Sequence, residues 1–132
     1  MEEADIIIKK LNMIKHPEGG YYQEIHKNKF VSQIYYLLKK NQKSKWHRLG
    51  KDEILHFYEG SPIEVFTKRD SNLKKYILGR DMLYSITIEK NTWFGMKSQG
   101  NYSLIGCTVA PPFVFSDLEI YSNNHTNLLP EI

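Results

Sequence analysis

The sequence has few of the features that would place it in a specialised class of protein. It has a single cysteine, Cys107, so an intramolecular disulfide is excluded, and the apolar, strand-like residues around it predict a buried, inert thiol. The apolar run 6–8 is too short for a membrane span or a signal-peptide core, and the residues before it are acidic. We therefore expect a cytoplasmic protein with no membrane partner.

An excess of charge of one sign is also missing. The formal net charge is +3 at pH 7, and the lysines are spread along the chain as pairs rather than gathered in one stripe. The densest basic segment, residues 39–45, is best interpreted as a solvated loop between two strands, although it could attract an anionic ligand. No glycine-rich phosphate loop is present. We expect no nucleic-acid partner.

The length and composition indicate an ordered globular protein. A chain of 132 residues is typical of one domain, which we expect to span residues 1–132. Aromatic residues make up 13% of the sequence, and this supply favours strands over helices.

The apolar pattern predicts one helix followed by many strands. Ala4, Ile7, Ile8 and Leu11 have helical spacing, so we expect a short amphipathic helix that ends before the turn 16–20. His16, beside a proline, is interpreted first as a turn residue. Residues 63–65 and 84–88 alternate between apolar and polar, as in strands with one buried face. Strand-like runs lie at 21–26, 32–38, 45–49, 53–58, 63–68, 73–78, 83–88, 92–96 and 102–109, a spacing typical of an all-β sandwich or barrel.

One segment nearly has the spacing of metal ligands inside a β-barrel. That spacing is His-x-His, three or four residues, Glu, six residues, Gly, and here it falls on His47, Leu49, Glu53 and Gly60. Alternate residues of a strand point to one face, so positions 47 and 49 both point inward, and a carboxylate from the next strand can join them. Leu49 supplies no donor atom, and two ligands rarely hold a catalytic metal. We expect no bound metal.

This spacing resembles the first motif of the cupin superfamily. The whole chain is similar to its small single-domain branch of unknown function, cupin family five, through segments at 16–22 (HPEGGYY), 34–38, 47–49, 52–53, 56–60, 78–81, 91–94 and 103–111. The resemblance implies an all-β fold, a double-stranded β-helix or jelly roll, with a pocket between its sheets and a homodimeric assembly. Phe94 stands where the second cupin motif has its last histidine.

The implied pocket would hold one imidazole, one carboxylate and several aromatic rings. Such a cavity suits a small-molecule ligand. We expect a small polar metabolite, a sugar or nucleotide derivative, to bind there without metal or other cofactor. The candidate ligand-binding residues are Tyr22, Tyr36, His56, Tyr58, Trp93 and Phe94.

Alternatives to simple binding stay open, and the sequence does not decide whether the protein is an enzyme. The resemblance also extends to metal-independent sugar epimerases, in which His47 would be the base, Glu53 would orient it and a tyrosine would be the acid. A metal-binding cupin would use His47, Glu53 and His56, although strand alternation places Glu53 and His56 on opposite faces. A dimeric scaffold with a closed cavity is the third alternative.

Overall fold

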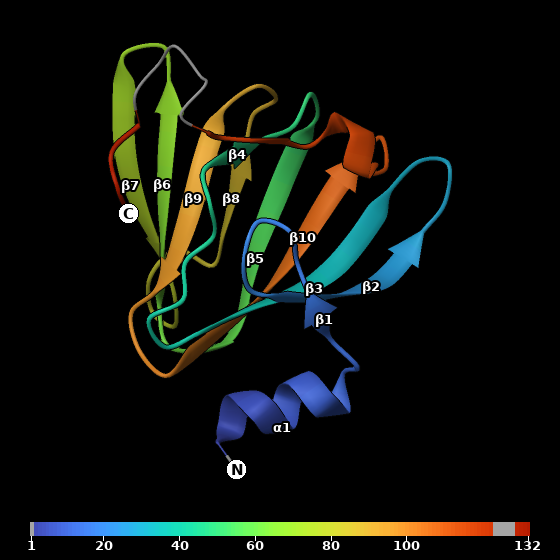
Figure 1. Ribbon diagram of the computed structural model, residues 1–132, viewed down its shortest axis with the longest axis vertical. Helices are drawn as coiled ribbons and strands as arrows, with labels where there is room; N and C mark the ends of the chain where they lie inside the picture. The colour runs from blue at the N-terminus through green and yellow to red at the C-terminus, as the bar shows by residue number, and fades with distance from the viewer. Residues whose placement is uncertain (1, 123–128) are drawn as a thin grey trace.

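Two antiparallel β-sheets face each other, and one helix lies at the N-terminal end of the chain (Figure 1). This computed structural model describes residues 2–122 and 129–132. Among these residues, one sheet has the strand order β1-β2-β3-β10-β5-β8 and the other has β11-β4-β9-β6-β7. The arrangement is the jelly roll with a short N-terminal helix that the sequence predicts. The elements are α1 (Glu3–Lys10), β1 (Ile14–Lys15), β2 (Tyr21–Lys27), β3 (Ser32–Lys39), β4 (His47–Arg48), β5 (Asp52–Gly60), β6 (Ile63–Arg69), β7 (Asn72–Leu78), β8 (Ser85–Ile88), β9 (Trp93–Ser98), β10 (Tyr102–Ala110), a 3-10 turn η1 (Phe115–Asp117) and β11 (Glu119–Ile120).

Each strand-like run of the sequence coincides with a strand, but the lengths differ. The predicted run 45–49 forms only the two-residue strand β4, and the run 83–88 begins two residues late, at Ser85 in β8. Strands β1 and β11 were not predicted. Each has two residues, which is too short to show an alternating pattern.

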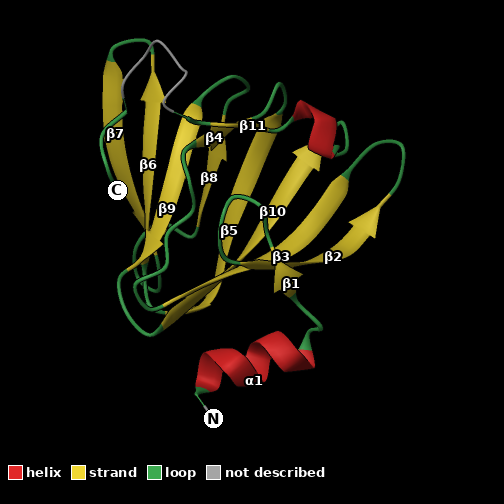
Figure 2. Ribbon diagram, in the orientation of Figure 1, coloured by secondary structure: helices red, strands yellow, loops and turns green. Residues whose placement is uncertain are grey.

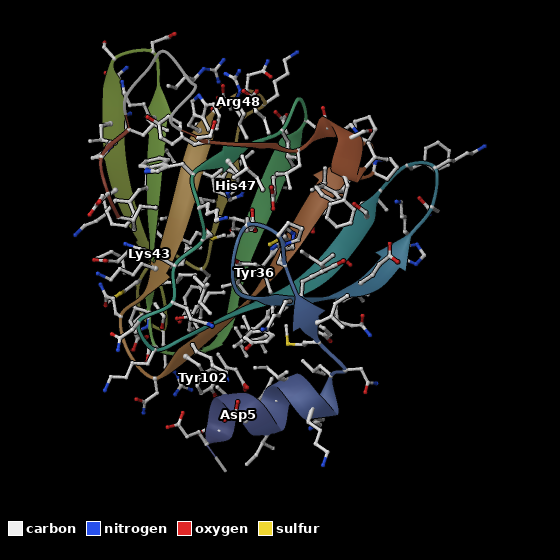
Figure 3. The ribbon with its side chains drawn as sticks, in the orientation of Figure 1. Asp5, Tyr36, Lys43, His47, Arg48 and Tyr102 are labelled. Carbon is white, nitrogen blue, oxygen red and sulfur yellow. The ribbon has the colours of Figure 1, made fainter. Side chains whose placement is uncertain are left out.

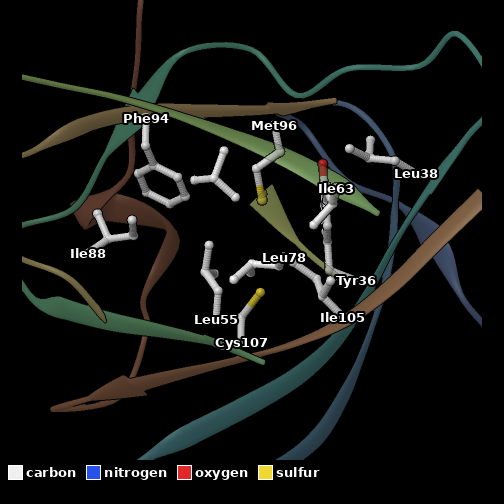
Figure 4. Packing of buried hydrophobic residues seen from close by; sticks show 11 residues of the cluster. Tyr36, Leu38, Leu55, Ile63, Leu78, Ile88, Phe94, Met96, Ile105 and Cys107 are labelled. Atoms are coloured by element: carbon white, nitrogen blue, oxygen red, sulfur yellow. The ribbon is translucent and has the colours of Figure 1, made fainter. Parts of the chain in front are cut away.

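The hydrophobic core lies between the two sheets and is built from alternate strand residues (Figure 4). In β6, Ile63 and Val65 are fully buried, whereas Glu64 between them is half-buried. In β8, Ile88 is buried and Thr87 is exposed. The alternation predicted for residues 63–65 is confirmed, and in the segment 84–88 it holds from Ser85 onward, whereas Tyr84 is 55% exposed. The buried cluster consists of Tyr36, Leu38, Leu55, Ile63, Val65, Leu78, Ile88, Phe94, Met96, Ile105 and Cys107.

Helix α1 packs on the six-stranded sheet (Figure 2). Ala4 of the helix lies in a second apolar cluster with Leu37 of β3 and Leu104 of β10, which point away from the core between the sheets. At the edge of this contact, Lys39 Nζ lies 2.6 Å from Asp5 Oδ1. Both faces of β3 and β10 are therefore buried where the helix covers them. Within the described residues, no helix is both long and apolar enough to cross a membrane.

Gly60, the glycine of the first motif, ends β5 at a turn that has no room for a side chain. Its φ is +96°, in the left-handed region that favours glycine. A Cβ at this position would lie 2.5 Å from the carbonyl oxygen of Tyr102 in the neighbouring strand β10. The glycine thus lets the two strands stay close at this turn.

Candidate functional site

A cavity of about 350 Å³ opens beside β2 and extends into the space between the two sheets. Four ionisable side chains line its closed end, here called the floor, and all four are buried: His16, Glu18, His47 and Glu53. Aromatic side chains line its open end, here called the rim: Tyr22, Phe113 and Phe115. The cavity therefore combines a buried polar floor with aromatic rings at its entrance.

His47 belongs to β4 and lies between the two sheets (Figure 3). Its ring packs on Phe94, with ring centroids 4.1 Å apart. Nδ1 donates to the carbonyl oxygen of Lys45 at 2.7 Å, and Nε2 lies 2.6 Å from Oε2 of Glu18. Burial lowers the pKa of His47, but the charge and hydrogen bond of Glu18 and the Lys45 carbonyl outweigh burial, so the pKa is raised. Both ring nitrogens of His47 thus face acceptor oxygens, which favours the charged imidazolium beside the Glu18 carboxylate.

Glu18 reaches the floor from the loop between β1 and β2, residues 16–20. The loop is held by hydrogen bonds from the amide of His16 to the carbonyl of Gly20, at 2.9 Å, and from the amide of Lys45 to the carbonyl of Glu18, at 2.6 Å. Gly19 has a φ of +107°, and a Cβ there would lie 2.7 Å from the carbonyl oxygen of Lys43. The Gly-Gly turn thus allows the loop to fold inward and present Glu18 to His47.

His16 is a second imidazole on the floor, and its tautomer follows from one contact. The amide of Glu18 donates to His16 Nδ1 at 3.1 Å, and because an amide can only donate, the neutral ring carries its proton on Nε2. Burial lowers the pKa of His16; Glu18 raises it and His47 lowers it. Nε2 of His16 has no hydrogen-bond partner among the described residues. Every fully buried polar side-chain atom in that part of the chain does have one, so Nε2 is not fully buried, and its N–H is open to the cavity that His16 lines.

Glu53 of β5 completes the floor as a carboxyl group that ionises with difficulty. Burial raises its pKa to about 7; the positive charge of His47 opposes this shift, and the negative charge of Glu18 adds to it. Burial, followed by the nearby negative charges of Glu53 and Glu18, raises the pKa of the Cys107 thiol well above its usual value. The prediction of a buried thiol is confirmed. At neutral pH Glu53 is present in both its acid and its ionised form.

The rim is closed on one side by the segment between β10 and β11, residues 111–118, here called the strap. The rings of Phe113 and Phe115 meet edge to face, with centroids 4.9 Å apart, and Phe115 remains 50% exposed. Tyr22 of β2 stands opposite, 6.3 Å from the Phe115 ring. The amide of Phe113 donates to Ser32 Oγ at 2.8 Å, which fixes the strap to β3. The strap thus holds aromatic rings over the cavity entrance.

The structure brings some of the predicted residues to the cavity and places others elsewhere. His47, Glu53 and Tyr22 line the cavity. Glu18 makes the hydrogen bond to His47, whereas Glu53 acts on His47 through its charge. His16 and Glu18 were missed, although both lie in the HPEGGYY segment that carries the family resemblance.

The other five candidate ligand-binding residues do not line the cavity. Tyr36 is fully buried in the core, where its hydroxyl donates to the Gly19 carbonyl, and Phe94 is covered by its packing on His47. Trp93 is buried beneath the guanidinium of Arg48.

His56 and Tyr58 point out from the sheet that carries Glu53. Leu55 of β5 lies in the core, so alternation sends residues 56 and 58 to the opposite face. There His56 Nε2 contacts Thr108 Oγ1 at 3.1 Å, and the Tyr58 ring meets Tyr35. Neither side chain reaches the floor.

These positions do not fit the metal-binding alternative. His56 is on the wrong face of β5 to join His47 and Glu53, and both ring nitrogens of His47 already have partners. Leu49 adds an apolar wall in place of a donor. Across the described residues, no group of three or more His, Cys, Asp or Glu side chains is arranged to hold a metal ion. The donor set of the floor is that of an ion pair beside a carboxyl group.

Comparison with known proteins supports the fold and the family. A crystal structure of a protein from Shewanella oneidensis is 32% identical, with a TM-score of 0.87 over 92% of this chain and 86% of that chain. A hypothetical protein from Leishmania major is 26% identical, with a TM-score of 0.82 over 92% of this chain and 88% of that one. The capsular polysaccharide assembling protein CapF from Staphylococcus aureus, 13% identical, shares the fold over 82% of this chain and 33% of its own, with a TM-score of 0.68. No curated protein matches the chain significantly.

The family match covers most of the sequence. Residues 5–121 match the family described as cupin superfamily (DUF985). This range includes the loop 16–20, the two strands that carry His47 and Glu53, and the strap. The resemblance that the sequence motifs indicate is therefore confirmed, and this chain belongs to the DUF985 family of the cupin superfamily.

Proposed function

We propose that this protein binds a small polar metabolite of the sugar or nucleotide class in the cavity between its sheets, without a metal ion. The observation that carries the proposal is the convergence of His16, Glu18, His47 and Glu53 on the floor of one cavity. Small-molecule sites are concave, about 300–1,000 Å³ in volume, and mostly apolar with a few convergent polar groups. A cavity of about 350 Å³ falls at the lower end of that range.

The energetics of the floor support a functional rather than a structural role. Two charges buried as the His47–Glu18 pair lose their hydration, and well-packed apolar residues in their place are often equally or more stabilising. Glu53 adds a third ionisable group whose charged form is disfavoured. Side chains with pKa values shifted by burial and specific partners, set in a cavity, are typical of binding and catalytic sites.

Removal of one rim ring tests the proposal without disturbing the core. Phe115 is 50% exposed and Phe30 is 68% exposed, but only Phe115 lines the cavity, so Phe115→Ala and Phe30→Ala are a matched pair. Ligand-observed NMR and thermal shifts would be recorded with a panel of sugars and nucleotides. We expect Phe115→Ala to weaken binding about two- to tenfold, since a ring contact contributes about 0.5–1.5 kcal/mol. The proposal fails if no compound binds, or if both variants bind as the wild type does.

Proton transfer on the bound ligand is a second candidate, and Glu53 together with His16 favours it. The ionised form of Glu53 can take a proton from a ligand, and Nε2–H of the neutral His16 can donate a hydrogen bond to the neighbouring carbonyl oxygen, whereas both nitrogens of His47 are already engaged. Solvent deuterium exchange into keto sugars would test this activity. Loss of exchange in Glu53→Gln but not in Glu131→Gln would assign the base to Glu53, and the absence of exchange in the wild type would exclude the reaction. Whether the chain forms a homodimer stays a prediction that light scattering can test.

A further inference from the structure

On the basis of the proposed function, we infer that the ligand is a hydroxyl-rich ring compound that carries no negative charge, such as an unphosphorylated sugar, and that the cavity discriminates against phosphorylated and nucleotide-linked forms. The inference narrows the proposed ligand class by the charges that line the site.

The cavity offers an anionic ligand no unpaired cation at its floor. Glu18 and Glu53 are there as carboxyl groups, and the one buried positive charge, on His47, is already bound to Glu18. Lys27 is the only lysine or arginine that lines the described part of the cavity, and it is exposed on β2, the strand that also contributes Glu24 to the lining. A phosphate at the floor would meet more negative than positive charge, in surroundings where burial strengthens the repulsion.

The basic segment 39–45 does not compensate, although the sequence suggested that it could attract an anion. Lys39 is ion-paired with Asp5 at the helix, and Lys43 Nζ donates to the carbonyl of Ile132 at 3.0 Å. None of the lysines in this segment lines the cavity. The segment therefore supplies no phosphate-binding charge to the site.

Backbone amides do not form an anion site at the floor either. The loop 16–20 contains two glycines, but the amides of His16 and Gly19 donate to carbonyl groups within the loop, and the amide of Glu18 donates to His16 Nδ1. Helix α1 packs in the apolar cluster on the other side of the six-stranded sheet, so its N-terminus is not at the cavity. The two usual backbone devices for holding phosphate are thus missing from the described lining.

The same groups suit hydroxyl groups well. A hydroxyl both donates and accepts, and the floor has a donor in Nε2–H of His16 and, in Glu53, a carboxyl that can do both below about pH 7. The rings of Tyr22 and Phe115 can pack on the apolar face of a sugar ring. The cavity is therefore complementary to a neutral polyol ring.

The test compares each sugar of a hexose panel in three forms: free, as its 1-phosphate and as its uridine-diphosphate derivative, by calorimetry at fixed salt. We expect a free sugar to bind at least about tenfold more tightly than its phosphorylated forms, a difference of about 1.4 kcal/mol. Equal or tighter binding of a phosphorylated form would overturn the inference and leave the proposed function standing. If no form of any sugar binds, the proposed function itself fails, and the inference fails with it.

A variant then shows whether the floor carboxylates cause the discrimination. In Glu53→Gln at about pH 8 one negative charge is removed, so the ratio of the dissociation constants for the phosphorylated and free sugar should fall several-fold. Glu131→Gln removes an exposed carboxylate that does not line the cavity, and it should leave the ratio unchanged. An unchanged ratio in Glu53→Gln would refute the electrostatic cause.

Discussion

The substitution Glu53→Gln should stabilise the protein above neutral pH and do so progressively less as the pH falls. Glutamine has nearly the shape of the protonated carboxyl, so it keeps the packing of the floor and removes the ability to ionise. Burial raises the folded-state pKa of Glu53 from 4.5 to about 7. Between these values the folded state binds a proton that the unfolded state has released. The contribution of Glu53 is therefore most favourable below about pH 4.5 and is lost as the pH rises through about 7.

The magnitude follows from the gap between the two pKa values. A gap of about 2.5 at about 1.4 kcal/mol for each pKa unit amounts to about 3 kcal/mol. This is a large share of the roughly 5–15 kcal/mol that stabilises a typical domain. Relative to the wild type, the variant should thus gain about 3 kcal/mol of unfolding free energy between about pH 4.5 and pH 8.

Urea denaturation at intervals from about pH 5 to pH 9 would measure this gain as the difference between the variant and the wild type at each pH. Taking the difference removes the titrations that both proteins share. Glu131→Gln is the control, because its carboxylate is exposed, and its curve should run parallel to the wild type. Parallel curves for Glu53→Gln as well would mean that Glu53 ionises normally in the folded protein, and the reasoning on the floor would be refuted.

Three further perturbations test the floor and the loop below it. His47→Asn leaves Glu18 buried without its cation, so it should lower the unfolding free energy by about 3–5 kcal/mol, and adding Glu18→Gln should recover part of that loss in the same urea assay. Gly19→Ala should cost more than about 1 kcal/mol, because the φ is positive and the new Cβ would clash with the carbonyl of Lys43; an unchanged urea midpoint would contradict this. The Cys107 thiol should resist a disulfide reagent in the folded protein and react fully in urea, and rapid reaction of the native protein would show that the thiol is accessible.

The strands could be predicted from the sequence because their apolar residues alternate. Ile63 and Val65 face the core and Glu64 does not, as the pattern requires. The alternation fails as a guide in β3, where Tyr36 packs between the sheets and Leu37 packs under α1, so apolar side chains cover both faces. This explains why the sequence could not say which tyrosine faces the cavity.

The floor could be predicted only as far as short-range spacing reaches. His47 and Glu53 lie in adjacent segments of one motif, and their strands, β4 and β5, belong to the two facing sheets, so that both side chains reach the same space. Glu18 and His16 come from a loop far earlier in the chain, and no local pattern says that this loop folds back between the sheets. The same alternation that selects Glu53 also sends Tyr58 outward, so that candidate could have been excluded from the sequence.

Leu49 and Phe94 stand at two metal-ligand positions of the cupin motifs, and these apolar residues explain why the charge of His47 depends on the loop 16–20. Phe94 packs on His47, and Leu49 forms part of the wall, so the imidazole lies where water cannot stabilise its charge. Burial alone would favour the neutral form of His47. The carboxylate of Glu18, whose Oε2 lies 2.6 Å from Nε2 of His47, reverses that effect and occupies this nitrogen as its hydrogen-bond partner. Leu49 and Phe94 thus supply no metal donor at two motif positions, and Glu18 engages the imidazole that stands at a third. Under the proposed function, His16 and Glu53 are the floor groups left to contact a ligand.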